Sequence, residues 1–233
     1  MALVLTKKPK NVTLIEGFPG FGLVSTITTG FLLDHLKCEQ IGKYHFEKVS
    51  PMVAIHNCKA VDPVGVYYND KYNIVIVHAI TAPQGIEWEA AEILADIAKQ
   101  LTAKELITIE GIGSQEVQNR VFFYTENLKT KKKFESINVP CIGEGIVVGV
   151  TGALLQKYKG NMTCIFTEAQ TNMPDSGAAA KIIEILDKYL ELKVDYSPLL
   201  KQAKAFEDKL KGILEQAQKT KELKDSKELS YLG

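Results

Sequence analysis

The segment from residue 12 to residue 36 constrains the fold more than any other part of the chain. Val12–Glu16 is the kind of short apolar run that predicts a buried strand, and a glycine-rich turn follows it at 17–22. Leu23–Leu36 then carries apolar residues at helical spacing. Because parallel strands are joined by helical connections of this kind, the segment predicts an α/β fold with a buried central sheet.

The rest of the chain continues the alternation of strands and helices. Segments rich in β-branched and aromatic residues predict strands at Met52–His56, Pro63–Tyr68, Asn73–Ala79, Glu105–Glu110, Arg120–Thr125, Val139–Ile142 and Met162–Thr167. Helical spacing predicts helices at Ile86–Leu101, with Trp88 on its apolar face, at Ile146–Tyr158, and from a cap at Asp175 or Ser176 to Leu190. The turn residues Asn69-Asp70-Lys71 predict a hairpin, so we expect a mixed sheet.

We therefore expect a three-layer α/β/α domain over residues 1–195, with a mixed, mostly parallel sheet. Hydrophobic residues make up 45% of the chain and charged residues 24%, which is typical of a globular protein with a substantial core. After Pro198 glycine becomes rare, and lysine and glutamate dominate. This change predicts a helical C-terminal extension over 196–233, with an end that we expect to be mobile.

Charge and cysteine content argue against several classes of function. The 28 basic residues equal the 28 acidic ones, so the chain lacks the basic excess that nucleic acids or membrane surfaces attract. No window has the ~18–20 uninterrupted apolar residues of a membrane span, and the N-terminal apolar run is too short for a signal peptide. We therefore expect a cytoplasmic protein. Neither the cysteines nor the histidines have metal-ligand spacing, so we expect no metal or cofactor.

Three glycine-rich turns are the candidate binding elements. The first contains Gly17, Phe18, Gly20, Phe21 and Gly22, and its GxxGxG spacing matches neither the dinucleotide nor the phosphate-loop motif. Gly111 and Gly113, and the Gly143-Glu144-Gly145 run, follow later predicted strands. Such loops meet at the carboxyl ends of the strands, where a small-molecule pocket is one interpretation and tight turn geometry is the other. Glu110 and Glu144 are candidates for a carboxylate pair, whereas Ser114 lacks a nucleophile elbow. The lysines of 129–133 predict a solvated loop.

The C-terminal extension carries a regular apolar stripe. Its residues recur at alternating steps of four and three, which is a heptad seam, and they are Leu199, Ala203, Phe206, Leu210, Ile213 and Ala217. A helix of this length is marginal in water when isolated, so the stripe is expected to be buried. It packs either on the chain's own domain or between subunits. Beyond Lys219 the seam ends, and the chain finishes in Leu229-Ser-Tyr231-Leu232-Gly233.

Taken together, these motifs resemble the archaeal branch of the proteasome assembly chaperone 2 family. The resemblance rests on the first strand with its Gly17–Gly22 turn, on Glu110–Gly113, and on the Gly143–Gly152 segment. It also rests on Asn172-Met-Pro-Asp175, which leads into the small-residue helix at Ala178–Ala180, and it covers about residues 10–195.

The resemblance implies an architecture similar to nucleoside phosphorylases without their catalytic residues. It further implies a non-enzymatic assembly factor that associates with itself and acts on proteasome α-subunits, a related family member or another complex. Members that dock on proteasome α-subunits are expected to do so through a C-terminal hydrophobic–Tyr–any-residue tail. Leu229, Tyr231, Leu232 and Gly233 would then bind the partner, although Tyr231 stands third from the end and Ser230 precedes it. The alternative is a small-molecule binder or an enzyme of the hydrolase or phosphorylase type that uses the glycine loops as its pocket.

Overall fold

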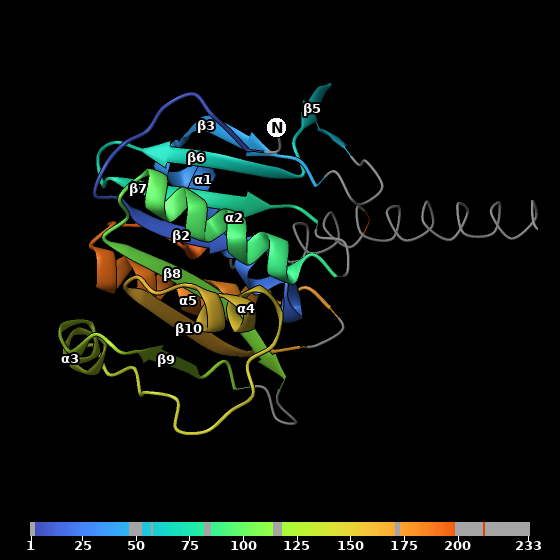
Figure 1. Cartoon of the computed structure of the whole chain (residues 1–233). Helices are drawn as coiled ribbons and strands as arrows, with labels where there is room; N and C mark the ends of the chain where they lie inside the picture. The colour runs from blue at the N-terminus through green and yellow to red at the C-terminus, as the bar shows by residue number, and fades with distance from the viewer. Residues whose placement is uncertain are drawn as a thin grey trace, which may run out of the picture.

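The computed structural model shows a three-layer α/β/α fold (Figure 1). It describes residues 3–46, 53–56, 58–81, 85–113, 118–170, 173–198 and 212. The central sheet has eight strands in the order β1-β3-β6-β7-β2-β8-β10-β9. Their bounds are Leu3–Leu5 (β1), Thr13–Gly17 (β2), Glu39–Tyr44 (β3), Val64–Asn69 (β6), Ile74–Ala79 (β7), Glu105–Gly113 (β8), Val121–Thr125 (β9) and Met162–Ala169 (β10).

The sheet is mixed, as predicted. Its central strands β7, β2, β8 and β10 are parallel, with Leu14 of β2 opposite Val75 on one side and Leu106 on the other. Strands β6, β3 and β1 extend it antiparallel beyond β7, and β9 does so beyond β10. The pairing of β6 with β7 confirms the predicted hairpin. The four central strands therefore end at the same edge, which brings their loops together.

Two pairs of helices cover the sheet, one pair on each face (Figure 1). The helices α1 (Val24–Leu36) and α5 (Ser176–Leu190) pack with Ile15 and Ile107 into one core. The helices α2 (Glu87–Gln100) and α4 (Gly149–Lys157) pack with Leu14 and Leu106 into the other. Alternate residues of one strand thus enter opposite cores, which is why the central strands are apolar throughout.

Four further elements complete the described part of the chain. The turn η1 (Phe21–Leu23) joins β2 to α1, and α3 (Leu128–Ser136) follows β9. The strands β4 (Ala54–His56) and β5 (Lys59–Val61) form a separate hairpin, which corrects the single strand predicted at Met52–His56. Within the described residues, no helix has the length and apolar character needed to cross a membrane.

The lysines of 129–133 lie in helix α3, so the prediction of a loop there was wrong. The Asn127 side chain caps the helix by accepting hydrogen bonds from the backbone N–H groups of Lys129 (2.9 Å) and Thr130 (3.2 Å). Phe134 anchors it, because this side chain is fully buried between the rings of Phe123 and Tyr189. The lysines themselves face solvent, as predicted.

The predictions for 139–158 need two corrections. Val139–Ile142 is no strand but a single bridge between Cys141 and Phe123, because Pro140 has no N–H to continue a ladder. The helix expected from Ile146 begins at Gly149, since Val148 is extended and Gly149 has a φ of 72°. Residues 143–148 therefore form a connecting segment without helix or strand.

Other differences concern exposure and the ends of the chain. Trp88 is 49% exposed rather than on the buried face of α2. The strands β1 and β3 were not predicted. Every seam residue from Leu199 to Ala217, and the last residues Leu229 to Gly233, lie outside the described residues. Ser114 and Asn172 do so as well.

Candidate functional site

The loop between β2 and α1 is packed into place at the carboxyl end of the sheet. Gly22 has a φ of 63°, in the left-handed region that favours glycine. A Cβ on Gly22 would also lie 2.9 Å from Cβ of Ala169, at the end of β10. The Gly22 carbonyl accepts a hydrogen bond of 2.8 Å from the Asp175 N–H. Glycine is therefore required here by both conformation and space.

Asp175 connects this loop to the start of α5. Its carboxylate caps the helix by accepting from the Ala178 N–H at 2.9 Å, which confirms the predicted cap. The same carboxylate accepts from the Gln170 N–H at 3.1 Å. Two motifs that are far apart in the sequence, 17–22 and 172–175, thus meet at Asp175.

The second glycine motif packs against the first. Gly111 continues strand β8 instead of forming the predicted turn, and a Cβ there would overlap the Phe21 carbonyl oxygen. A Cβ on Gly20 would overlap Oε1 of Glu110. Because neither glycine has a side chain, β8 and the first loop can approach each other closely.

Glu110 is the carboxylate at the centre of these motifs. Its Oε2 accepts a hydrogen bond from the Thr151 hydroxyl at 3.3 Å, which links β8 to α4. Burial, and then the negative charge of Glu16, raises the pKa of Glu110 to about 8. Glu110 is therefore mainly protonated at pH 7.

Glu16 is the second buried carboxylate, and sequence reasoning did not single it out. It accepts hydrogen bonds from the backbone N–H groups of Phe18 (2.9 Å) and Ile109 (3.1 Å). Burial raises its pKa to about 7, against the lowering effect of these two hydrogen bonds. The signal in the sequence was a glutamate at the end of an otherwise apolar strand. Glu16 thus holds the first loop to β8.

The predicted pairing of Glu110 with Glu144 was wrong. Glu144 is exposed on the segment before α4, whereas Glu110 is largely buried and interacts with Glu16. The reason is the late start of α4, which leaves Glu144 on the surface.

Phe18 and Phe21 occupy different environments. Phe18 is 4% exposed and lies edge-on to Phe46 in the core, with a centroid separation of 6.3 Å. Phe21 is 44% exposed. The first loop is thus closed by its own Phe18 and by Glu110, which favours the interpretation as turn geometry over an open phosphate cradle.

The buried reactive groups near this site have structural roles. The His78 ring contacts the Thr29 hydroxyl at 2.8 Å, and burial lowers the pKa of His78 to about 4, so the ring is neutral. Burial raises the pKa of the Cys164 thiol to about 12, so it is no thiolate nucleophile. Cys58 and Cys141 are exposed free cysteines. Among the described residues, no cluster of His, Cys, Asp and Glu is suited to hold a metal ion.

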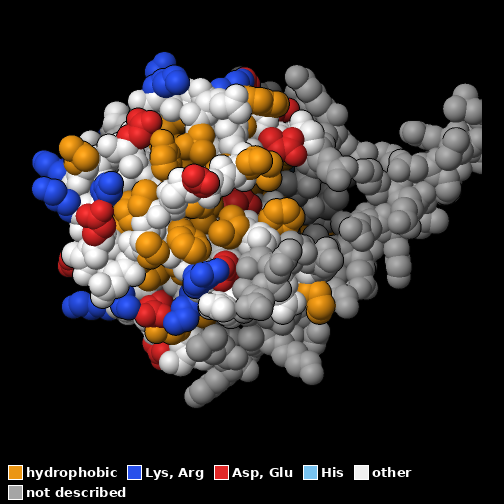
Figure 2. Space-filling view, turned by 90° about the horizontal axis from the view of Figure 1, so that it is seen from below, with side chains coloured by type: hydrophobic (Ala, Val, Ile, Leu, Met, Phe, Trp, Pro, Cys, Tyr) orange, Lys and Arg blue, Asp and Glu red, His pale blue; other side chains and the backbone are white. Residues whose placement is uncertain are grey.

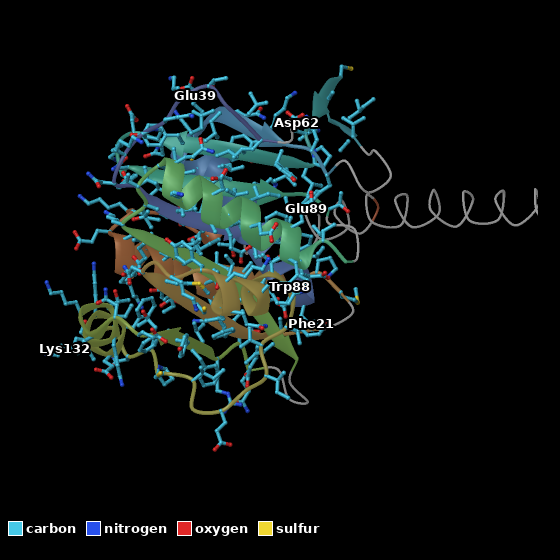
Figure 3. The ribbon with its side chains drawn as sticks, viewed as in Figure 1. Phe21, Glu39, Asp62, Trp88, Glu89 and Lys132 are labelled. Atoms are coloured by element: carbon cyan, nitrogen blue, oxygen red, sulfur yellow. The ribbon has the colours of Figure 1, made fainter. Side chains whose placement is uncertain are left out.

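Exposed apolar side chains surround the packed loops. Phe21 follows β2, Trp88 begins α2, and Met173 follows β10. Figure 3 shows Phe21 and Trp88 at the same end of the molecule. We call Phe21, Trp88 and Met173 the strand-end face. Exposed apolar groups above packed loops are typical of a surface that contacts other proteins.

The fold and this site define a three-layer α/β protein in which the loops at the carboxyl ends of the central strands pack tightly against one another. The chain belongs to the PAC2 family, whose model matches residues 14–214. It is similar to Pyrococcus furiosus PbaA, an archaeal homolog of proteasome-assembly chaperone, with 30% identity, 94% of this chain and 98% of PbaA covered, and a TM-score of 0.82. It is also similar to Pyrococcus furiosus PbaB, an archaeal proteasome activator, with 25% identity, 91% and 97% covered, and a TM-score of 0.75.

A third relative is an uncharacterized protein, MJ0106, of Methanocaldococcus jannaschii. It is 28% identical over 212 residues, which cover 89% of this chain and 87% of the relative. The family predicted from the glycine and Met-Pro-Asp motifs is therefore confirmed.

Proposed function

We propose that this protein is a cytoplasmic, non-enzymatic assembly factor that associates with itself and docks on proteasome α-subunits. One observation carries the proposal, namely that the chain matches PbaA over nearly the whole length of both proteins. PbaA is a homolog of a proteasome-assembly chaperone and PbaB is a proteasome activator, so the proteasome is the partner that both relatives suggest.

The geometry of the strand-end loops supports the non-enzymatic part of the proposal. Catalysis by acyl or glycosyl transfer needs a nucleophile or base beside an accessible reacting atom. Here Glu16 binds backbone N–H groups, Gly20 packs directly against the Glu110 carboxylate, and Phe18 is buried in the core. The same arrangement leaves Phe21 and Trp88 exposed, as a protein contact needs. The enzymatic alternative has no comparable support.

The C-terminal residues are the proposed docking element. Leu229, Tyr231, Leu232 and Gly233 provide two apolar groups, one aromatic group and a terminal carboxylate. Capture of a C-terminal carboxylate in a pocket is a recurring mode of peptide recognition. The seam from Leu199 to Ala217 would connect this tail to the rest of the assembly, either on the chain's own domain or between subunits.

A binding experiment with purified proteasome α-subunits tests the proposal. The full chain should capture the α-subunits, and deletion of Tyr231–Gly233 should abolish capture while light scattering gives the same mass. Ser230→Ala is the matched control, because it changes the tail without removing the aromatic group or moving the carboxylate. If the full chain captured no α-subunits, the proposal would be wrong. If the deletion still captured them, the docking element would lie elsewhere.

A further inference from the structure

The segment between β9 and α4 carries an exposed apolar surface that is separate from the strand-end face. It runs below the sheet in Figure 1, from α3 to α4. Ile146 is 93% exposed, and Val148 is 58% exposed. Glu144 is the one charged residue in 140–148. Figure 2, which views the molecule from the β9 side, shows hydrophobic side chains gathered in the middle of this face and charged ones around them.

The two glycines of this segment are not required by the fold of a single chain. A Cβ on Gly143 would meet nothing within 4 Å, and one on Gly145 would meet only Cδ1 of Ile142 at an ordinary 3.4 Å. Neither glycine has a positive φ. Among the described residues, residues 143–146 also make no backbone hydrogen bond. A glycine that has no positive φ and no close neighbour is not required by the fold of its own chain. Its missing side chain is suited to close approach by another molecule.

A hollow of about 330 Å³ lies directly beside Ile146. Its lining is mostly apolar and consists of Tyr124, Ile142, Val147, Leu155 and Phe166, together with Gly143, Glu144 and Gly145. Ile146 stands between two residues that line the hollow, yet its own side chain faces solvent. The surface therefore presents an apolar projection and an apolar recess side by side.

We propose that residues 142–148 bind a second copy of this chain across a two-fold axis, with Ile146 of each copy in the hollow of the other. A two-fold interface uses the same patch twice, so a projection next to a recess is self-complementary. Gly143 and Gly145 allow the two backbones to approach, and one charge per copy keeps the loss of hydration small. This inference rests on the self-association proposed above and specifies its surface.

The test measures the mass of the full chain by light scattering at micromolar concentration. The wild type should have at least twice the monomer mass. Ile146→Asp removes the apolar projection, and Gly145→Leu adds a side chain whose Cβ meets only Ile142, at an ordinary distance, in the single chain. Both variants should reduce the mass at least two-fold while keeping the far-ultraviolet circular dichroism of the wild type. Ile55→Asp is the matched control, because Ile55 is an equally apolar residue, 77% exposed, on the β4–β5 hairpin. It should leave the mass unchanged.

The remaining outcomes separate this inference from the proposed function. If the wild type is a monomer, both the interface and the proposed self-association are wrong. If the wild type is an oligomer and both variants keep its mass, the interface is wrong but self-association stands. A folded Ile146→Asp monomer that still captures proteasome α-subunits would support the interface and show that docking does not need it.

Discussion

At the scale of single residues, two buried glutamates make the stability of this protein depend on pH. The folded protein raises the pKa of Glu16 to about 7 and that of Glu110 to about 8, from ordinary values near 4.5. The folded state therefore favours the protonated forms. Their stabilising contribution is complete below pH 4.5 and decreases as the pH rises through 7 and 8.

Glu110→Gln tests this linkage, because glutamine keeps the shape and cannot ionise. Ionisation of Glu110 alone should cost the wild type about 3 kcal/mol of unfolding free energy between pH 5 and pH 8, and ionisation of Glu16 adds to this loss. The variant should lose clearly less, and at pH 8 it should be the more stable protein. Urea unfolding at pH 5, 6.5 and 8 measures the difference. Glu135→Gln, on an exposed side chain of α3, should follow the wild type. Parallel curves for all three proteins would contradict the role of Glu110.

Gly22 is the second residue whose role is measurable. Gly22→Ala forces a Cβ into the left-handed region and against Ala169, so it should cost about 2–4 kcal/mol of unfolding free energy. Gly143→Ala has open space around its Cβ and should cost less than about 1 kcal/mol. Equal thermal shifts for the two variants would show that the first loop tolerates a side chain.

At the scale of elements, the sequence predicted those whose pattern is local. The central strands and α1, α2 and α5 were found because their apolar spacing reflects burial against neighbours on one or both faces. The strands β1 and β3 were missed because β1 has only three residues and β3 begins with the exposed polar residues Glu39 and Gln40, so neither shows a clear apolar pattern. The helix α3 was missed because only Thr130 and Phe134 of it are buried, and Phe134 packs on the distant Tyr189. Glu16 was missed because its significance depends on β2 lying beside β8, which no local pattern states.

The C-terminal seam is predicted from the sequence alone, and its burial remains a proposal. If it is buried, Phe206→Ala or Leu210→Ala should cost about 2–5 kcal/mol in stability or assembly. Lys211→Ala and Glu215→Ala lie off the seam and should cost little. Thermal unfolding combined with light scattering separates the two packings that remain open. Loss of stability at constant mass indicates packing on the chain's own domain, whereas loss of mass indicates packing between subunits. No change in either quantity would show that the seam is not buried.

At the scale of the whole molecule, the proposed docking depends on the residues on either side of Tyr231. The tail that the resemblance implies has a hydrophobic residue before the tyrosine and one residue after it, whereas here Ser230 precedes Tyr231 and Leu232-Gly233 follow it. One extra residue moves the terminal carboxylate by about 3.3–3.6 Å relative to the tyrosine ring, which is more than a hydrogen bond tolerates.

Removal of Gly233 together with Ser230→Leu restores the family's tail without changing the folded domain. If a pocket on the α-subunit reads both the ring and the carboxylate, this variant should capture α-subunits more tightly than the wild type. Removal of Gly233 alone should have a smaller effect in the same direction, because the carboxylate is corrected but the apolar contact is not. Titration of each variant against α-subunits measures the order. Weaker capture by both variants would mean that the partner is adapted to the longer tail, and the spacing from Tyr231 to Gly233 would then be the specific feature of this protein.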